Sequence, residues 1–330
     1  MIVVNIAVIG MGLIGGSLLR ALALAGHWVI GYDLDPSTRA MARTGAAQAP
    51  KESRWQVAPS IGDAVSKADL AVVATPLTAV AHVLDEIAGA GFTGLITDVV
   101  SVKEPVRQLV HRRLRSGGMN LTGYVGGHPM AGRETAGFAA ADPELFRACA
   151  WVLCLEEETN LSDWLGLARL VTGLGARVVP TTAADHDRVV AAVSHVPHLL
   201  AAALATSISD PLAATLAAGS FKDGTRVAGS APELIAAMCG GNAESVLDAL
   251  DLVLGRLDQV HDALDSDDPI GQVRAWAAPA HAARSTWPKG WGEPTQIAAK
   301  PDALLALGDE GGWITAVSAD GRTVTAALPI

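Results

Sequence analysis

The stretch NIAVIGMGLIGGSLLRALALAG at residues 5–26 sets a glycine-rich turn between a β-branched run and a helix-forming segment. Its glycines have the spacing GxGxxG, which suits a tight turn, a close approach of backbone to a pyrophosphate and close packing of helix on strand. The first amide groups of such a helix offer N–H donors and partial positive charge to phosphates. The stretch therefore predicts a dinucleotide site at the first strand–helix turn. The residues predicted to bind the cofactor there are Gly10, Gly12, Leu13, Ile14 and Gly15.

An acidic residue ends the second strand-like segment, WVIGYD at residues 28–33. The Asp33 carboxylate lies about 20 residues after the glycines, where it accepts hydrogen bonds from both ribose hydroxyls and repels a 2′-phosphate. It therefore predicts NAD as the cofactor, although Arg39 in the following helical segment argues for NADP. Thr75 ends a further strand-like run, so we expect it beside the nicotinamide, as the cap of the next helix, or in both roles.

Strand-like and helix-like segments alternate through the first half of the chain, which predicts an α/β fold with a doubly wound, Rossmann-type parallel sheet. The chain is then rich in Ala and Leu with long helical patterns, and its apolar surface exceeds what one small domain buries. We expect an all-α domain that forms a homodimer, with a self-contained monomeric bundle as the alternative. The predicted domains are 1–182 (nucleotide-binding), 183–287 (helical) and 288–330, a linker followed by a small β-meander of unknown role.

The net charge is -10, from 24 Lys and Arg against 34 Asp and Glu, and the chain has no block of basic residues. Nucleic acid and anionic membrane surfaces are therefore not expected as partners. The N-terminus lacks the basic segment of a signal peptide, and no apolar run looks long enough to span a bilayer, so we expect a cytoplasmic protein. The cysteines, Cys149, Cys154 and Cys239, match no metal-ligand spacing, and no metal is expected.

Three segments supply candidates for the proton transfer that accompanies hydride transfer to a nicotinamide. TDVVSVKEPV places Ser101 just after a strand, at the mouth of the ligand crevice. GGHPMAGRETAG places His128 in a glycine-lined turn, because both a helix and a regular strand disfavour this composition. AVSHVPHLLAA places His195 and His198 three residues apart on one helical face, a pair for which no third metal ligand stands out.

Taken together, these motifs resemble the prephenate and arogenate dehydrogenases of tyrosine biosynthesis, over roughly residues 4–280. The shared motifs are GxGxxG with Asp33, DVVSVK, GGHPMAG followed by Glu134, SHVPH, and FKDGTRVAGSAPEL at 221–234. The resemblance implies oxidative decarboxylation: NAD takes hydride from the ring C4 of prephenate, carbon dioxide leaves from C1, and the ring aromatises to 4-hydroxyphenylpyruvate. Prephenate is favoured over arogenate because no acidic residue is clearly placed to bind the ammonium group of arogenate.

The resemblance also implies a role for each candidate residue. His128 corresponds to the family's catalytic histidine, which takes the proton of the C4 hydroxyl, and Ser101 to the serine that orients it. This step needs a neutral imidazole, and a cationic nicotinamide nearby disfavours imidazolium. Arg226 corresponds to the arginine that grips a substrate carboxylate, a task that suits a bidentate guanidinium. The other implied substrate-binding residues are His198, which reaches the side-chain carboxylate, and Glu134 and Lys222, which form an ionic gate with Asp223 and Arg226. A solvated surface run of charges is the alternative for Lys222 and Asp223.

Two other functions fit parts of the sequence. A β-hydroxyacid dehydrogenase or imine reductase would use a lysine of the helical domain, where only Lys222 stands out, and would leave the His128 motif unexplained. A non-catalytic NAD-binding regulator would tolerate substitution of His128 or Arg226 by alanine with no effect beyond stability. Within the resemblance, Ile235 stands where many relatives carry tryptophan, so the preference for the substrate's side chain stays open.

Overall fold

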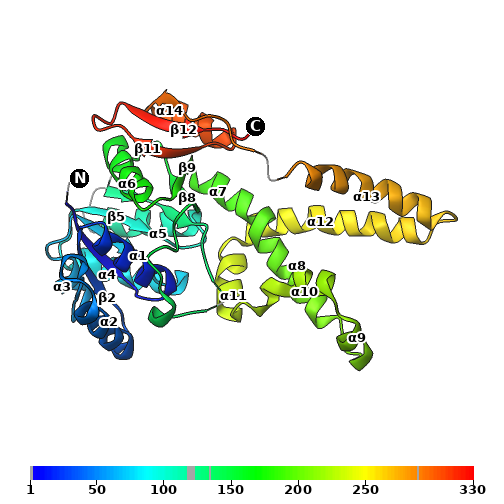
Figure 1. Cartoon of the computed structure of the whole chain (residues 1–330), viewed down its shortest axis with the longest axis horizontal. Helices are drawn as coiled ribbons and strands as arrows, with labels where there is room; N and C mark the ends of the chain where they lie inside the picture. Colours follow the sequence, from blue (N-terminus) through cyan, green and yellow to red (C-terminus); the bar gives the residue numbers. More distant parts are fainter. Residues whose placement is uncertain (1–2, 117–122, 134, 288–289) are drawn as a thin grey trace. The chain divides into compact units, whose positions relative to one another are not determined.

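The computed structural model describes residues 3–116, 123–133, 135–287 and 290–330. The chain forms two compact units (Figure 1). The first unit is discontinuous in sequence, because it contains Met1–Asp187 and also Pro294–Leu328. The second unit contains Arg188–Glu293 and the last two residues.

The first unit is built around a six-stranded sheet in which every neighbouring pair of strands is parallel, in the order β3-β2-β1-β4-β5-β6. Its strands are β1 (Asn5–Ile9), β2 (Trp28–Tyr32), β3 (Gln56–Val57), β4 (Leu70–Val73), β5 (Leu95–Asp98) and β6 (Tyr124–Val125). The order reverses between β1 and β4, as it does in doubly wound sheets whose ligands bind at the carboxyl ends of the strands. The predicted Rossmann-type sheet is confirmed.

Helices cover both faces of this sheet (Figure 1). They are α1 (Leu13–Leu24), α2 (Pro36–Gln48), the short η1 (Lys51–Ser53), α3 (Ile61–Val65), α4 (Leu77–Gly89) and α5 (Glu104–Ser116). Alternate residues of β1 explain the two layers. Ile6 and Val8 pack with α1 in one apolar cluster, whereas Ala7 and Ile9 pack with α3, α4 and α5 in another. A strand buried on both faces needs the continuous apolar run that the sequence has there.

A second sheet completes the first unit, with strand order β10-β12-β11-β9-β8-β7. Its strands are β7 (Gly127–Pro129), β8 (Ala150–Cys154), β9 (Arg177–Thr181), β10 (Thr295–Ala298), β11 (Trp313–Val317) and β12 (Thr323–Ala327). Strands β8 and β9 are parallel and joined by α6 (Leu161–Gly173), and the other pairs are antiparallel. The short η3 (Phe138–Ala140) lies between β7 and β8 in the sequence.

His128 lies in strand β7, so the expectation that this composition excludes a regular strand is wrong. The segment pairs with β8 residue by residue, His128 opposite Val152. The neighbouring glycine has a packing role, because a Cβ on Gly127 would come within 2.7 Å of the main-chain oxygen of Asp98. The glycine allows β7 to cross closely over the carboxyl end of β5, which brings His128 to the ligand-binding edge of the parallel sheet.

The C-terminal tail contains a helix as well as strands, which differs from the predicted β-meander. The segment ALLALGD forms part of α14 (Pro301–Asp309), where Leu304 and Leu307 are three residues apart and both buried. The end of this helix packs tightly on β9, since a Cβ on Gly308 would come within 1.8 Å of the Pro180 main-chain oxygen. Strand β10 falls inside the stretch predicted as a linker, and β11 pairs with β9. The tail is therefore part of the first unit.

The second unit is helical in its described residues. It begins within α7 (Ala183–Val190) and continues through the π-helical turn η4 (Ala191–His195), α8 (Val196–Thr206), α9 (Pro211–Leu216), α10 (Gly219–Thr225), η5 (Arg226–Gly229), α11 (Pro232–Gly241), α12 (Ala243–Leu264) and α13 (Pro269–Ser285). Helices α12 and α13 lie side by side (Figure 1), and the Trp276 indole donates to the Arg256 main-chain oxygen at 3.2 Å. The predicted helical domain is confirmed.

The helical run Ala183–Thr206 is long and apolar enough to cross a membrane by length and composition, with a mean hydropathy of 1.6 in its most apolar window. This run differs from the expectation that no apolar run is long enough and free enough of polar breaks to span a bilayer, because its charged residues gather in the first turns. Within the second unit, Ala191 and Val196 of this run pack against Val246 of α12 and form its small core.

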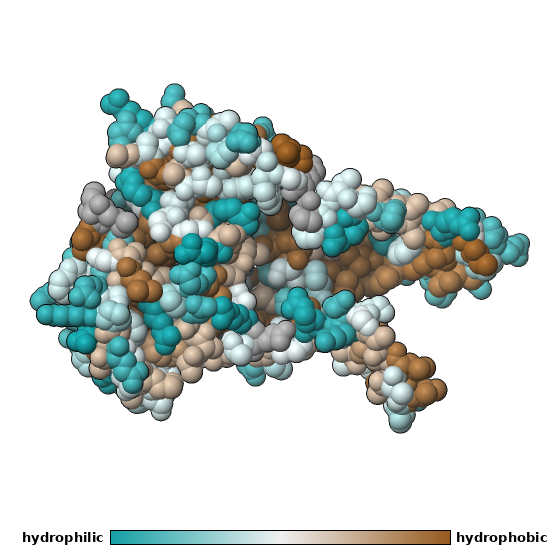
Figure 2. All heavy atoms as spheres, viewed as in Figure 1, coloured by the Kyte–Doolittle hydropathy of each residue, from teal (hydrophilic) through white to brown (hydrophobic). Residues whose placement is uncertain are grey.

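Much of the apolar surface of the second unit is exposed. Figure 2 shows brown, hydrophobic surface along α12 and α13. Large side chains there are more than half exposed: Leu247, Leu252, Leu264 and Ile270. An exposed apolar face of this extent is typical of a surface that another protein chain covers.

Candidate active site

The glycine turn has the shape that its spacing predicts. Gly10 has a φ of +98°, and its N–H donates to the Tyr32 main-chain oxygen at 2.7 Å. A Cβ on Gly10 would lie 2.4 Å from the Ala74 main-chain oxygen, and one on Gly15 would lie 1.9 Å from the Gly10 oxygen. In contrast, a Cβ on Gly12 would meet nothing within 4 Å. Two glycines are therefore required by packing, and the third leaves open space at the start of α1, where a pyrophosphate fits.

The carboxylate of Asp33 is fixed beside this turn. One oxygen accepts the Met11 main-chain N–H at 2.7 Å, and the other accepts that of Asp35 at 2.9 Å. Arg39 lies in α2 as predicted, but its side chain reaches back to the end of β2 and donates to the Asp33 main-chain oxygen at 2.6 Å. Both an acceptor and a cation therefore flank the position expected for the adenosine ribose.

Thr75 follows β4 on the other side of the turn. Its methyl carbon lies 3.0 Å from the position of a Cβ on Gly10. Among the described residues, the Thr75 hydroxyl is buried without a hydrogen-bond partner. The next helix is capped by Pro76 with no side-chain hydrogen bond, so Thr75 is not its cap. A buried hydroxyl without a protein partner fits a site where a bound nucleotide supplies that partner.

His128 is half-buried and is linked to a second histidine. Its Nδ1 lies 2.9 Å from Nε2 of His186, and the two rings meet edge to face with centroids 5.1 Å apart. Nδ1 of His186 lies 2.7 Å from Oδ1 of Asp187. Both His186 and Asp187 are buried. The three side chains form a linear series that ends in a carboxylate.

Asp187 is itself held by the first turn of α5. Its two oxygens accept the main-chain N–H groups of Lys103 at 2.8 Å and Glu104 at 2.9 Å. A carboxylate at a helix N-terminus satisfies free donors and interacts well with the helix dipole. His186 and Asp187 are not among the residues predicted from the sequence. The sequence feature that could have indicated them is the adjacent pair of ionisable residues in TTAADHDRVV at 181–190, just before an apolar helical stretch.

A buried lysine supports the strand that carries His128. The Lys103 ammonium pairs with the Asp98 carboxylate and donates to the Gly127 main-chain oxygen at 2.6 Å. The Tyr124 hydroxyl donates to the other Asp98 oxygen at 2.7 Å. Burial, reinforced by the Asp98 charge, holds the Tyr124 pKa well above its usual value, so this hydroxyl stays protonated.

Ser101 lies three residues beyond the end of β5 and is half-buried. The resemblance implies a hydrogen bond between Ser101 and the His128 imidazole. The contact that the structure gives for Nδ1 of His128 is the one with His186. Its orienting role stays a prediction.

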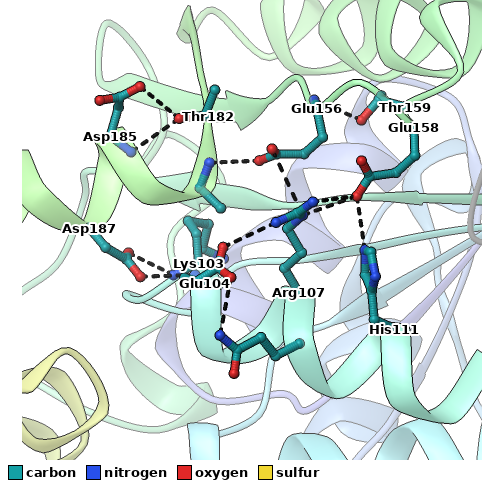
Figure 3. Close-up of polar contacts among 12 residues, drawn as sticks. Lys103, Glu104, Arg107, His111, Glu156, Glu158, Thr159, Thr182, Asp185 and Asp187 are labelled. Carbon is teal, nitrogen blue, oxygen red and sulfur yellow. Dashed lines mark hydrogen bonds and ion pairs between the residues drawn. The ribbon is translucent and has the colours of Figure 1, made fainter. Parts of the chain in front are cut away.

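A cluster of charged residues connects α5, the turn after β8 and the start of α7 (Figure 3). Arg107 of α5 donates to Glu158 at 2.8 Å and lies 3.8 Å from Glu156, both in the turn after β8. His111 also contacts Glu158, at 2.9 Å. Glu156 in turn accepts the main-chain N–H of Ala183 at 2.7 Å, at the start of α7. The cluster therefore ties α5 to the helix that carries His186.

The electrostatics of the two glutamates differ. Burial raises the pKa of the Glu156 carboxyl, although its hydrogen bond from Ala183 and the charge of Arg107 oppose the shift. Burial acts in the same direction on Glu158, but the hydrogen bonds from Arg107 and His111 outweigh it and lower the pKa of that carboxyl. Arg107 is thus held chiefly by an ionised Glu158.

Most predicted substrate-binding residues belong to the second unit. His195 is buried, and the Asn242 amide lies 3.4 Å from its Nδ1. His198 is half-buried, and its Nδ1 lies 2.8 Å from the Ser194 main-chain oxygen. A π-helical turn ends at His195, and the regular helix α8 begins at the next residue and carries His198.

Lys222 is exposed on α10 and Arg226 is exposed at the start of η5. Glu134 lies outside the described residues. Ile235, the residue that departs from the resemblance, lies half-buried in α11.

Comparison with known proteins decides the family. A family model described as "Prephenate dehydrogenase, nucleotide-binding domain" matches residues 18–180, and one described as "Prephenate dehydrogenase, dimerization domain" matches residues 182–274. A prephenate dehydrogenase of Bacillus subtilis is 32% identical over 274 residues, which are 80% of this chain and 71% of that protein. The chain belongs to the prephenate dehydrogenase family.

Solved structures of this family share the fold. A Corynebacterium glutamicum protein, provisionally described as a prephenate dehydrogenase, is 33% identical with a TM-score of 0.78, covering 88% of this chain and 91% of its own. The arogenate dehydrogenase of Synechocystis is 29% identical with a TM-score of 0.71, covering 86% of this chain and 99% of its own. The predicted family and fold are confirmed, and the chain is a dehydrogenase of this family with a nucleotide-binding domain.

Proposed function

We propose that the protein is an NAD-dependent prephenate dehydrogenase, which converts prephenate to 4-hydroxyphenylpyruvate and carbon dioxide in tyrosine biosynthesis. The observation that carries the proposal is the half-buried imidazole of His128, which strand β7 brings to the carboxyl edge of the parallel sheet. The glycine turn lies at that same edge, after β1. A proton acceptor and a nucleotide site on one edge are what an alcohol oxidation by a nicotinamide requires.

The residues around the glycine turn fit NAD. The open space at Gly12 and the N-terminus of α1 receive the pyrophosphate. The buried Thr75 hydroxyl, which has no partner in the part of the chain that the structure describes, is available to the nicotinamide end. The fixed Asp33 carboxylate accepts from the ribose hydroxyls. NAD, when bound, supplies the acceptor for the hydride that leaves C4 of the substrate.

His128 takes the proton of the C4 hydroxyl as the ketone character of that carbon develops, and Ser101 orients the imidazole. General-base assistance of this kind contributes about 10²–10⁴-fold to the rate. Arg226 and His198 bind the carboxylates of the dianionic substrate, with Glu134 and Lys222 as parts of a gate. The cation of Arg226 matters because the protein's net charge of -10 opposes an anionic ligand.

We further propose a cytoplasmic homodimer assembled through the helical unit. The family describes this region as a dimerization domain, and α12 and α13 expose large apolar side chains such as Leu252 and Ile270. A second copy of the chain that packs on the same face would bury these side chains in a closed, symmetric dimer. Light scattering coupled to gel filtration tests this, since a monomeric mass at micromolar protein would contradict it.

Arogenate dehydrogenase is the second candidate, favoured by the likeness to the Synechocystis enzyme. The deciding experiment measures NADH or NADPH formation by the purified full chain with each pairing of prephenate or arogenate and NAD or NADP. We expect the highest kcat/KM for prephenate with NAD. Turnover of arogenate alone would contradict prephenate as the substrate. Turnover of only small β-hydroxy acids would contradict oxidative decarboxylation as the reaction.

A further inference from the structure

We propose that His186 and Asp187 are positioning residues that hold the neutral His128 imidazole in the tautomer with its proton on Nδ1 and its lone pair on Nε2. The inference deepens the proposed function and rests on it for its catalytic consequence. The tautomer of His128 itself can be measured in a protein that is not turning over substrate.

The protonation pattern follows from the carboxylate outwards. Asp187 is an acceptor only, and its oxygens already receive two main-chain N–H groups from the start of α5. Nδ1 of His186, 2.7 Å away, must therefore donate to it. A neutral imidazole with its proton on Nδ1 has an acceptor at Nε2. That acceptor lies 2.9 Å from Nδ1 of His128, so His128 Nδ1 donates and its Nε2 is left as the base.

This tautomer of His128 requires a neutral His186, and the surroundings of His186 favour that state. Burial lowers the pKa of His186, and the nearby Lys103 ammonium acts in the same direction. The carboxylates of Asp187 and Asp98 oppose the shift without reversing it. At neutral pH, the His186 ring therefore accepts a hydrogen bond from His128 at Nε2 and donates one to Asp187 from Nδ1.

The pair also has a role after proton transfer. When His128 gains a proton on Nε2, its Nδ1–H strengthens its bond to His186, and the Asp187 carboxylate behind His186 stabilises the new positive charge. The same division of roles, in which a carboxylate orients an imidazole and stabilises the imidazolium, is worth about 10⁴-fold in serine proteases. Here an extra imidazole separates the carboxylate from the base, so a smaller effect is expected.

Two substitutions at His186 separate positioning from mere packing. In His186→Gln, the side-chain oxygen can accept from His128 while the amide donates to Asp187, so the required tautomer is retained. In His186→Leu, the volume is nearly kept and the acceptor is lost. We expect kcat for His186→Leu to fall about 100-fold, within the range of general-base effects, with KM little changed, and His186→Gln to recover most of it.

The decisive readout is the ¹⁵N NMR spectrum of histidine-labelled protein, with His128 assigned by its loss in His128→Asn. We expect a proton on Nδ1 of His128 in the wild type and in His186→Gln at neutral pH, and a proton on Nε2 in His186→Leu. The acid limb of the kcat/KM profile should move to lower pH in His186→Leu, because the imidazolium loses its support.

A proton on Nε2 of His128 in the wild type would overturn the inference, as would an unchanged tautomer in His186→Leu. If His186→Leu does not fold, the wild-type spectrum and the comparison of His186→Gln with wild type still decide the matter. Wild-type protein with the expected tautomer but no turnover of prephenate or arogenate would instead overturn the proposed function and leave the positioning in place.

Discussion

The ammonium of Lys103 donates to the main-chain oxygen of Gly127 at 2.6 Å, so a fully buried cation holds the residue directly before His128. The same ammonium neutralises Asp98, whose second oxygen accepts from Tyr124. A single lysine therefore links the end of β5 to the strand that carries the proposed base. This link is a structural requirement that the motif DVVSVK does not reveal by itself.

Lys103→Met should destabilise the protein by about 3–5 kcal/mol, because it leaves the Asp98 carboxylate buried without its partner. Urea unfolding of the variant measures the loss. The matched control is the double variant Lys103→Met with Asp98→Asn, which removes the unpaired charge. We expect the double variant to be more stable than Lys103→Met alone, and equal or lower stability would contradict an interaction between the two side chains.

Gly12→Ala should leave stability within about 0.5 kcal/mol of the wild type, because the added Cβ enters open space. The same methyl group occupies the position expected for the pyrophosphate, so KM for NAD should rise at least about tenfold. Gly15→Ala is the contrasting variant, since its Cβ would meet the Gly10 main-chain oxygen at 1.9 Å. It should lower the unfolding temperature clearly. A stable Gly15→Ala with normal cofactor binding would contradict the assignment of the turn.

Asp33→Ser should reduce the preference for NAD over NADP, because it removes the carboxylate that repels a 2′-phosphate. Arg39 stays available to bind that phosphate, since main-chain oxygens hold its guanidinium beside the site. We expect the ratio of kcat/KM for NAD to that for NADP to fall at least about tenfold. The double variant Asp33→Ser with Arg39→Ala should lose any increase in kcat/KM for NADP. If the ratio of kcat/KM for NAD to that for NADP is unchanged in both variants, residues other than Asp33 and Arg39 determine the cofactor preference.

His128→Asn should lower kcat by about 10²–10⁴-fold with little change in KM, because the proton of the C4 hydroxyl loses its acceptor. Arg226→Lys keeps the charge but loses the bidentate geometry, so its main effect should be a higher KM for prephenate. Initial rates over a range of prephenate concentrations separate the two patterns. Both variants with normal kinetics would contradict the enzyme proposal and favour a non-catalytic nucleotide-binding protein.

The stability of the first unit should fall as the pH is lowered from about 7 to 5, because burial lowers the pKa of His186 below its ordinary value of about 6.5. The unfolded chain then binds a proton that the folded chain resists, so the free energy of unfolding rises with pH up to the unfolded pKa. Urea unfolding at several pH values measures this slope. His186→Gln removes the titrating ring and should flatten it, and the same slope in both proteins would point to another group.

The glycine turn and the parallel sheet could be predicted from the sequence because each rests on local physics. The spacing of Gly10, Gly12 and Gly15 marks a strand–turn–helix in one short stretch, where Gly15 packs on the Gly10 main-chain oxygen, and the apolar run of β1 indicates burial on both faces. The helical second unit followed from composition in the same way. These features are visible within short stretches of sequence, although the partner that crowds Gly10 is the distant Ala74.

The positions of His128 and its partners could not be predicted, because they depend on contacts between distant segments. The strand β7 is too short to show a period, and its glycine serves a contact with the end of β5. His186 and Asp187 lie 58 or more residues further along the chain, so nothing near His128 indicates them. The helix α14 was missed for a different reason, since a short apolar run does not distinguish helix from strand.

The pairing of β11 with β9 has a consequence for how the chain matures. Strand β9 is finished more than a hundred residues before its neighbour in the sheet is synthesised, with the entire helical unit between them. During translation, the edge of β9 and the surface that later receives Leu304 and Leu307 stay uncovered while the helices emerge. The nucleotide-binding unit can therefore close only after the helical unit and β11 have been synthesised, and termination before β11 would leave the edge of β9 exposed to aggregation.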